Sequence, residues 1–204
     1  MHSLPLRQVH IDFHTSEHIP DVGSRFDPEV FASVLQGASV NSANIFAKCH
    51  HGWSYYDTEV GERHPNLKFD LLARQIEACK SAGIGAVIYY SIGWDERAAL
   101  LHPEWREIAP DGGFRCWGGH NLEAAWKSMC LNSPYLDYCC DQIRELARTF
   151  PQADGFWLDI IFMNECCCAN CLRSMEEKGL DWEISEHRRK EAYARRERYL
   201  RSVC

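Results

Sequence analysis

The sequence predicts an α/β fold of the (β/α)8 TIM-barrel type, of which about the first four βα units are present. Short apolar strands alternate with amphipathic helices along the chain, an order that is typical of parallel sheets with right-handed crossovers. No Gly-x-Gly-x-x-Gly motif follows the first strand, which disfavours a dinucleotide-binding sheet. Polar and aromatic residues instead follow the strand ends, where a barrel builds its active site.

Four segments have the residue pattern of strands. The first alternates between apolar and polar residues, whereas the third and fourth are almost continuously apolar, as expected for strands that are buried on both faces. The strands are expected to be parallel and to lie in sequential order, at residues 7–14, 42–48, 86–91 and 155–162.

Helices are expected between the strands and after them, on the outside of the sheet. Asp27 is suited to the N-cap of the first helix, with Pro28 at its first position, and Ser133 and Pro134 repeat this pattern later in the chain. Gly83 is expected to end the helix at residues 69–82. The helices are expected at residues 28–36, 69–82, 134–150, 168–178 and 185–202, with a short one near Ala98 inside the long connection 93–132.

Composition and charge exclude several classes of protein. The chain has 204 residues, of which 46% are hydrophobic and 25% charged, as in ordinary folded domains. Its net charge of −7 does not indicate the basic surface that a nucleic-acid-binding protein needs. It contains neither an apolar run long enough for a membrane span nor the apolar region of a signal peptide. We therefore expect a soluble cytoplasmic protein that binds neither nucleic acid nor membranes.

The segment after the second expected strand has the chemistry of a sugar-binding loop. Residues 46–56 read Phe-Ala-Lys-Cys-His-His-Gly-Trp-Ser-Tyr-Tyr. Their polar side chains can hydrogen-bond hydroxyl groups, and their aromatic faces can pack against C–H groups. The residues alone leave open a second interpretation, in which this is a polar loop whose aromatic side chains cap the barrel.

Three aspartates raise the question of a catalytic carboxylate. Asp159 lies within an apolar strand, where a carboxylate must be paired, hydrogen-bonded or functional because burial of an unpaired charge is costly. Asp12 poses the same question in the first strand, and Asp95 lies in a loop where aspartate often caps a turn or helix. A purely structural role remains open for each of them.

The cysteine pattern predicts a metal site. The chain has eleven cysteines and no secretory signal, which favours metal ligands or buried thiols over disulfides. Cys166, Cys168 and Cys171 form a Cys-x-Cys-x-x-Cys motif, and Cys130 at the end of the long connection can complete a tetrahedral Zn²⁺ site. Two alternatives stay open: Cys167 in place of Cys166, or unliganded cysteines that pack as small apolar residues.

Six motifs together resemble the barrel domain of hypothetical glycosyl hydrolase family 6, a group of glycoside hydrolases related to α-L-fucosidases. They reach from the first strand to about residue 180 and are Val9-His-Ile-Asp-Phe-His-Thr15, Phe46-Ala-Lys-Cys-His-His-Gly52, Tyr89-Tyr-Ser-Ile-Gly-Trp94, His102-Pro-Glu-Trp105, Cys130-Leu-Asn-Ser-Pro-Tyr135 and Gly155-Phe-Trp-Leu-Asp159. In α-L-fucosidases a Lys-His-His-Asp-Gly-Phe segment supplies histidines that bind the sugar. The segment Lys48-Cys-His-His-Gly-Trp53 is similar, with an inserted Cys and no Asp before the Gly.

The resemblance implies a retaining glycoside hydrolase, α-L-fucosidase-like or β-galactosidase-like, that acts on a glycan or oligosaccharide. Trp157-Leu-Asp159 is similar to the fucosidase nucleophile motif, which implies Asp159 as the nucleophile. A retaining enzyme also needs a general acid/base roughly 5–5.5 Å from the nucleophile, and in such enzymes it usually comes from later strands. The residues expected to hold the sugar or line the same mouth are His14, His50, His51, Trp53, Tyr89, Trp94 and Asp95.

The cysteine set is similar to the zinc cluster of barrel β-galactosidases. There, one Cys before an Asn/Ser-Ser/Asn-Pro motif joins a Cys-x-Cys-x-x-Cys segment after the fourth strand. This similarity implies Cys130, Cys166, Cys168 and Cys171 as ligands of a structural Zn²⁺, with no organic cofactor.

Residues 1–180 are expected to form the N-terminal half of the barrel, and residues 181–204 a charged helix. A whole barrel needs about 250 residues, so we expect a fragment that pairs with a missing C-terminal half or with another copy and shows little turnover alone. One rival interpretation is a non-catalytic carbohydrate-binding or zinc-stabilised half-barrel. A weaker rival is a thiol-based redox protein, which would need an exposed cysteine of low pKa.

Overall fold

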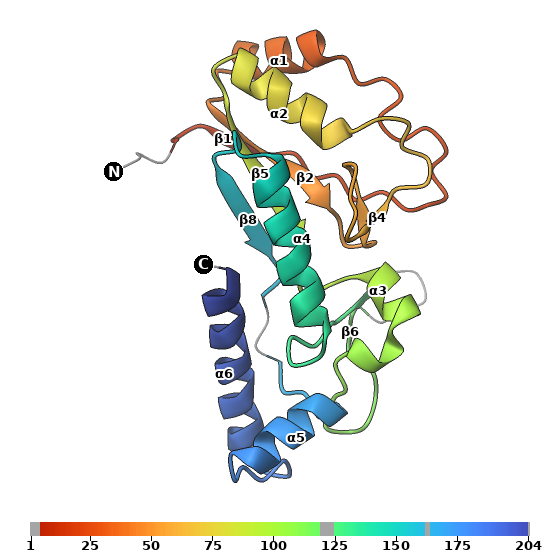
Figure 1. Cartoon of the computed structure of the whole chain (residues 1–204), viewed down its shortest axis with the longest axis vertical. Coiled ribbons are helices and arrows are strands. Elements are labelled where there is room, and N and C mark those ends of the chain that lie inside the picture. The colour runs from red at the N-terminus through yellow and green to blue at the C-terminus, as the bar shows by residue number, and fades with distance from the viewer. Residues whose placement is uncertain (1–4, 119–124, 162–163, 204) are drawn as a thin grey trace. The chain divides into compact units, whose positions relative to one another are not determined.

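The computed structural model describes residues 5–118, 125–161 and 164–203 (Figure 1). The chain divides into two compact units. The first contains Met1–Tyr90 and Arg144–Asp159, and the second contains Ser91–Ile143 and Ile160–Cys204.

The first unit is built on a six-stranded sheet. Its strands are β1 (Gln8–His10), β2 (Ser42–Lys48), β3 (Trp53–Ser54), β4 (Glu62–Arg63), β5 (Gly85–Ser91) and β8 (Gly155–Asp159). The order is β4-β3-β2-β5-β8, and β1 also pairs with β2. The four expected strands therefore lie in the predicted sequential order, β1-β2-β5-β8.

Strand β2 is the centre of this sheet. It pairs in parallel with β1 near its start, where His10 lies opposite Asn44, and with β5 from Ser42 onward. Its end pairs with β3 in the antiparallel direction through Lys48 and Ser54. All seven residues of β2 are buried, as expected for a strand with neighbours on both edges and covered faces.

Helices α1 (Pro28–Gly37) and α2 (Leu71–Ser81) pack against each other, and α2 packs against β2. The predicted cap of α1 is confirmed, because the Asp27 carboxylate accepts hydrogen bonds from the Glu29 and Val30 amides. Helix α2 begins two residues later than predicted. Its N-cap is Asp70, whose side chain accepts from the Ala73 amide at 2.7 Å.

The second unit is mainly helical. It contains α3 (Glu96–Leu101), a 3₁₀ helix (Pro103–Trp105), the hairpin of β6 (Cys116–Trp117) and β7 (Trp126–Lys127), α5 (Ala169–Glu177) and α6 (Ser185–Val203). Helix α4 (Tyr135–Thr149) begins in this unit, and its residues from Arg144 onward belong to the first. Helices α5 and α6 contact each other.

Two predicted strands are too long. The first strand was expected to reach residue 14, but its last bond to β2 is donated by the Ile11 amide to the Asn44 carbonyl. Asp12 and His14 contact each other instead. The fourth was expected to reach residue 162, but it ends at Asp159 because Ile160 has a φ of +62°, which turns the backbone out of the extended conformation. Residue 162 itself lies outside the described residues.

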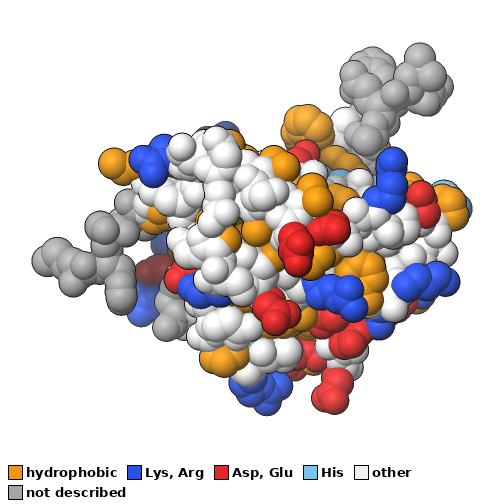
Figure 2. All heavy atoms as spheres, turned by 90° about the horizontal axis from the view of Figure 1, so that it is seen from above, with side chains coloured by type: hydrophobic (Ala, Val, Ile, Leu, Met, Phe, Trp, Pro, Cys, Tyr) orange, Lys and Arg blue, Asp and Glu red, His pale blue; other side chains and the backbone are white. Residues whose placement is uncertain are grey.

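Within the described part of the chain, no helix has the length and apolar character needed to cross a membrane. On the face shown in Figure 2, Lys and Arg side chains are interspersed with Asp and Glu.

Candidate functional site

A carboxylate at the end of β8 is held by a tyrosine on the neighbouring strand β5. Tyr89 donates a hydrogen bond of 2.7 Å from its hydroxyl to Oδ2 of Asp159. The Tyr89 ring is fully buried and stacks on Phe46, with 3.8 Å between ring centroids. Burial raises the pKa of the Tyr89 hydroxyl, and the adjacent Asp159 carboxylate raises it further. Tyr89 is therefore a fixed donor that stays protonated.

His14 lies in the segment that follows β1. Its Nε2 is 3.0 Å from Oδ1 of Asp12, and its Nδ1 accepts a hydrogen bond from the His50 amide at 3.1 Å. Burial lowers the pKa of His14, which Asp12 partly opposes. Because Nδ1 is an acceptor, the neutral ring carries its proton on Nε2, facing Asp12.

His50 follows β2 and stacks on the His14 ring, with 3.9 Å between ring centroids. Burial lowers the pKa of His50 to about 3, with smaller contributions from the neighbouring His14 and Lys48. His50 is therefore neutral near pH 7. A neutral imidazole can both donate and accept hydrogen bonds, which is what a sugar hydroxyl requires. His51 is half-buried, and its charge lowers the pKa of both His14 and His50.

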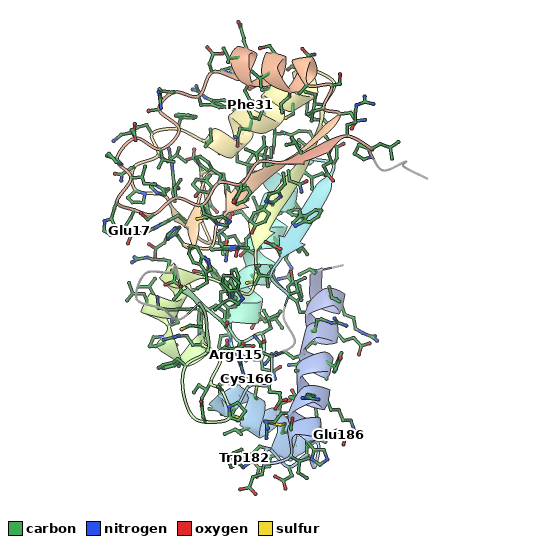
Figure 3. The ribbon with its side chains drawn as sticks, turned by 180° about the vertical axis from the view of Figure 1, so that it is seen from behind. Glu17, Phe31, Arg115, Cys166, Trp182 and Glu186 are labelled. Carbon is green, nitrogen blue, oxygen red and sulfur yellow. The ribbon has the colours of Figure 1, made fainter. Side chains whose placement is uncertain are left out.

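Trp53 lies in the short strand β3, where its indole is buried. Its Nε1 donates a hydrogen bond of 3.3 Å to Oε2 of Glu17, a residue labelled in Figure 3. The neighbouring Lys48 is fully buried, and its Nζ lies 4.5 Å from the centre of the Tyr90 ring.

Trp94 and Asp95 belong to the second unit. Asp95 is fully buried and is the N-cap of α3, because its Oδ1 accepts from the Ala98 amide at 2.8 Å. Its Oδ2 accepts from the Tyr135 hydroxyl at 3.3 Å. Trp94 is almost fully buried and packs beside Trp117, with 5.3 Å between ring centroids. These contacts give both residues a role in the packing of their own unit.

The first unit brings several predicted site residues into one network. His14 is coupled to His50 by the backbone hydrogen bond and the ring stack, and the Asp159 charge acts on the pKa of His14. Tyr89 joins the same group through Asp159 and through its edge-on contact with the His14 ring. The network combines one anchored carboxylate with imidazoles of lowered pKa, a combination that can position a sugar beside a nucleophile.

Four cysteine sulfurs converge in the second unit. Cys130, Cys166, Cys168 and Cys171 are buried, and their Sγ atoms all lie within 4.8 Å of one another. The Cys130 sulfur is 3.5 Å from those of both Cys168 and Cys171. A tetrahedral Zn²⁺ with bonds of about 2.3 Å spaces its sulfurs by roughly 3.8 Å. The four residues therefore fit a metal ion. Cys167, the alternative ligand, lies outside this group.

Hydrogen-bond donors surround these sulfurs. The Asn132 amide donates to Cys130 at 3.4 Å, the Asn132 side chain donates to Cys171 at 3.3 Å, and the Cys168 amide donates to Cys166 at 3.5 Å. Hydrogen bonds among the thiols lower the pKa of Cys166, to about 7, and that of Cys171, whereas they raise the pKa of Cys130. The amide donors support the thiolate form that binds a metal.

Three charged residues near these sites were not predicted from the sequence. Glu17 accepts from Trp53, and Arg195 and Glu107 form a buried ion pair of 2.8 Å beside the cysteines. Burial raises the pKa of Glu107 to about 7, although Arg195 opposes this shift. A signal for Arg195 was present in the spacing of Ala192, Arg195 and Tyr199, which share one face of α6.

Comparisons with known proteins agree with this architecture. The family model described as hypothetical glycosyl hydrolase 6 matches residues 27–160. The solved α-L-fucosidase isoenzyme 2 from Paenibacillus thiaminolyticus is 39% identical and superposes with a TM-score of 0.92, covering 98% of this chain and 30% of that chain. The α-fucosidase of Thermotoga maritima is 22% identical, with a TM-score of 0.51 over 71% of this chain and 31% of that chain, a likeness in fold alone. No curated protein matches.

These findings confirm the predicted fold class, α/β with about the first four βα units of a (β/α)8-type barrel. The chain spans 30% of the length of the Paenibacillus enzyme. The family match includes β2, β5 and β8, and with them Tyr89 and Asp159. The chain belongs to the hypothetical glycosyl hydrolase 6 family.

Proposed function

We propose that this chain supplies the nucleophile of a retaining glycoside hydrolase, and that the nucleophile is Asp159. The observation that carries the proposal is the hydrogen bond from Tyr89 to Oδ2 of Asp159 at the end of β8. That bond fixes the orientation of the carboxylate, so Oδ1 is the oxygen that we assign to attack. Enzymes with barrel folds carry their catalytic residues at the carboxyl ends of the strands, and Asp159 lies at such an end.

The reaction proceeds in two displacements. Oδ1 of Asp159 attacks the anomeric carbon while the bond to the leaving oxygen breaks, and a general acid protonates that oxygen. The resulting glycosyl ester is then hydrolysed by water, whose proton returns to the same acid/base group, and the Asp159 carboxylate is regenerated. We place the acid/base on a later barrel strand, outside this chain.

An α-L-fucoside is the substrate class that we favour, because the Paenibacillus structure, an α-L-fucosidase, matches 98% of this chain. His50 and His51 would contact sugar hydroxyls, with His14, Trp53 and the Tyr89 ring beside them. The inserted Cys49 does not alter the polar surface, because its side chain is fully buried. A β-galactoside is the second class to be assayed. Trp94 and Asp95 remain proposed as residues that contact the sugar.

The decisive variants are Asp159→Asn and Asp12→Asn in the full-length protein. Asparagine is nearly isosteric with aspartate but is a very poor nucleophile, so Asp159→Asn should reduce kcat by several orders of magnitude and leave the fold and KM largely intact. Asp12→Asn, which removes an exposed carboxylate beside His14, should reduce kcat far less. Unaltered turnover in Asp159→Asn would remove Asp159 from this role.

We also propose that Cys130, Cys166, Cys168 and Cys171 hold one structural Zn²⁺. Four protein ligands leave no open position for water or substrate, so this metal would stabilise the fold without taking part in the reaction. None of the cysteines among the described residues forms a disulfide, which suits a reducing compartment such as the cytoplasm.

A second function is a carbohydrate-binding half-barrel without turnover. It shares the proposed sugar contacts with the enzyme and differs in lacking a second carboxylate that faces Asp159. In our proposal residues 1–180 supply the N-terminal half of a barrel, residues 181–204 form a charged helix, and a C-terminal half or another copy completes the barrel. The isolated chain should then bind the sugar with little turnover, whereas rapid hydrolysis by the isolated chain would contradict the half-barrel arrangement.

A further inference from the structure

We propose that Arg195 is a constituent of the four-cysteine centre, and that its contact with the sulfurs makes the docking of α6 depend on the bound metal. This inference rests on the zinc site proposed above. In this arrangement a residue of α6 offsets part of the negative charge of the thiolates.

Arg195 lies on α6 and is buried, with 2% of its surface exposed. Its Nη1 donates to the Cys171 sulfur at 3.4 Å and to the Cys130 sulfur at 3.7 Å. Its Nη2 donates to Oε1 of Glu107 at 2.8 Å and to the Asn164 carbonyl at 2.9 Å. One guanidinium therefore bridges two sulfurs and a carboxylate, which the compact ammonium of a lysine cannot do.

The charges explain why a cation is needed at this position. Four thiolates around a divalent ion carry a net charge of −2, and burial of such a charge without compensation is costly. Glu107 lies between Arg195 and Arg115, whose Nε is 3.7 Å from Oε2 of Glu107. With Glu107 ionised, these three residues together carry one positive charge, so they offset half of the charge of the centre. Arg115 and Cys166 are both labelled in Figure 3.

A second residue of α6 reaches the same centre. Glu191, one turn before Arg195, is buried and accepts a hydrogen bond of 2.8 Å from the Asn132 side chain. The same Asn132 nitrogen donates to the Cys171 sulfur. The remaining buried residues of α6 are Ala192 and Tyr199, a small apolar face for a helix of 19 residues. Polar contacts to the metal centre therefore help to hold α6 in place, together with the ion pairs of Arg188 and Arg189 with Glu165.

Loss of the metal removes the partner of Arg195. Without the ion the sulfurs are no longer held at one point, so the contacts of Arg195 with Cys130 and Cys171 are no longer fixed. Among the described residues, Glu107 is the charged partner that the buried guanidinium then retains, and α6 should loosen. Removal of Arg195 should conversely weaken metal retention by about 10- to 100-fold, the usual effect of losing a residue that supports metal ligands.

The test compares wild type with Arg195→Met, Arg195→Lys and Arg201→Met. Arg201 is exposed on the same helix and, among the described residues, forms an ion pair with Glu197 of α6, so Arg201→Met is the matched control. Two quantities are measured: the rate at which Zn²⁺ passes to a chromogenic chelator, and the rate of tryptic cleavage within α6, which is rich in Lys and Arg. Both are read on the purified protein without an activity assay.

We expect Arg195→Met to release Zn²⁺ at least about tenfold faster than wild type and to be cleaved faster in α6, with Arg195→Lys intermediate and Arg201→Met unchanged. Wild-type protein stripped of zinc should show the same rise in α6 cleavage, a result that needs no substitution. If zinc-loaded Arg195→Met matches wild type in both rates, or if stripping leaves cleavage of α6 unchanged, the role of Arg195 is contradicted while the zinc site stands. If wild-type protein binds no zinc, the zinc site and the role of Arg195 are both contradicted.

Discussion

The Tyr89 hydroxyl donates a hydrogen bond of 2.7 Å to Oδ2 of Asp159, and this bond joins the neighbouring strands β5 and β8. Because the Tyr89 ring is fixed between Phe46 and the edge of His10, the carboxylate is held before any substrate arrives. An oxygen in a set position needs less reorganisation to reach the transition state.

Tyr89→Phe removes this donor and keeps the ring that stacks on Phe46. A hydrogen bond to a charged group contributes about 1.5–3 kcal/mol, so we expect kcat to fall roughly 10- to 100-fold while the fold is retained. Steady-state kinetics of the full-length protein provide the measurement. Tyr90→Phe, a change at the next residue, whose ring lies against Lys48, is the matched control. Equal kcat values in the two variants would argue that Tyr89 does not position Asp159.

His50 should make the protein less stable in acid. Its pKa is about 3 in the folded chain, compared with about 6.5 for an exposed histidine. Between these values the unfolded state binds the proton and the folded state does not, so the free energy of unfolding falls as the pH falls from about 6.5 towards 3. Urea unfolding of wild type at pH 7 and pH 5 should show this loss, and His50→Gln should show a smaller one.

His18→Gln is the control for that measurement, because the His18 side chain is 87% exposed. It should retain the full pH dependence of wild type. If His50→Gln loses as much stability between pH 7 and pH 5 as His18→Gln does, His50 is not the group responsible.

Metal analysis should find about one Zn²⁺ per chain. Cys171→Ser should abolish this content, because its sulfur lies in the converging group. It should also lower Tm, because metal binding that is linked to folding stabilises the folded state. Cys167→Ser changes an adjacent cysteine outside the group and should leave both zinc content and Tm unchanged. If Cys171→Ser retains zinc, or if Cys167→Ser loses it, the proposed set of four ligands is wrong.

The parts of the fold that the sequence predicts well are those with strong local signals. The almost continuously apolar run in β5 and the Asp27-Pro28 start of α1 locate their elements almost to the residue. Strands β3 and β4 were missed because two residues are too few to show a period. The first strand was extended too far because residues 11–14 keep an alternating pattern after they leave the sheet.

The cysteine group was predictable for a similar reason, since three ligands are close in sequence and Cys130 precedes a recognisable motif. Arg195 was missed because it lies in a highly charged helix, where its spacing from Ala192 and Tyr199 is a weak indication of burial. The hydrogen-bond partners of Asp95 and Tyr89 likewise could not be predicted from the sequence, because they depend on which side chains the tertiary fold brings together. The roles of the predicted sugar-binding residues remain predictions.

The most direct test of the central claim is to trap the covalent intermediate on the full-length protein. A 2-deoxy-2-fluoro glycosyl fluoride slows hydrolysis of the glycosyl ester because fluorine destabilises the oxocarbenium-like transition state, while fluoride leaves without a general acid. Peptide mapping by mass spectrometry should then find one sugar attached to the peptide that contains Asp159, and none in Asp159→Asn. A sugar attached to the peptide that contains Asp12, or no adduct on an enzyme that turns over the substrate, would contradict the assignment of Asp159 as the nucleophile.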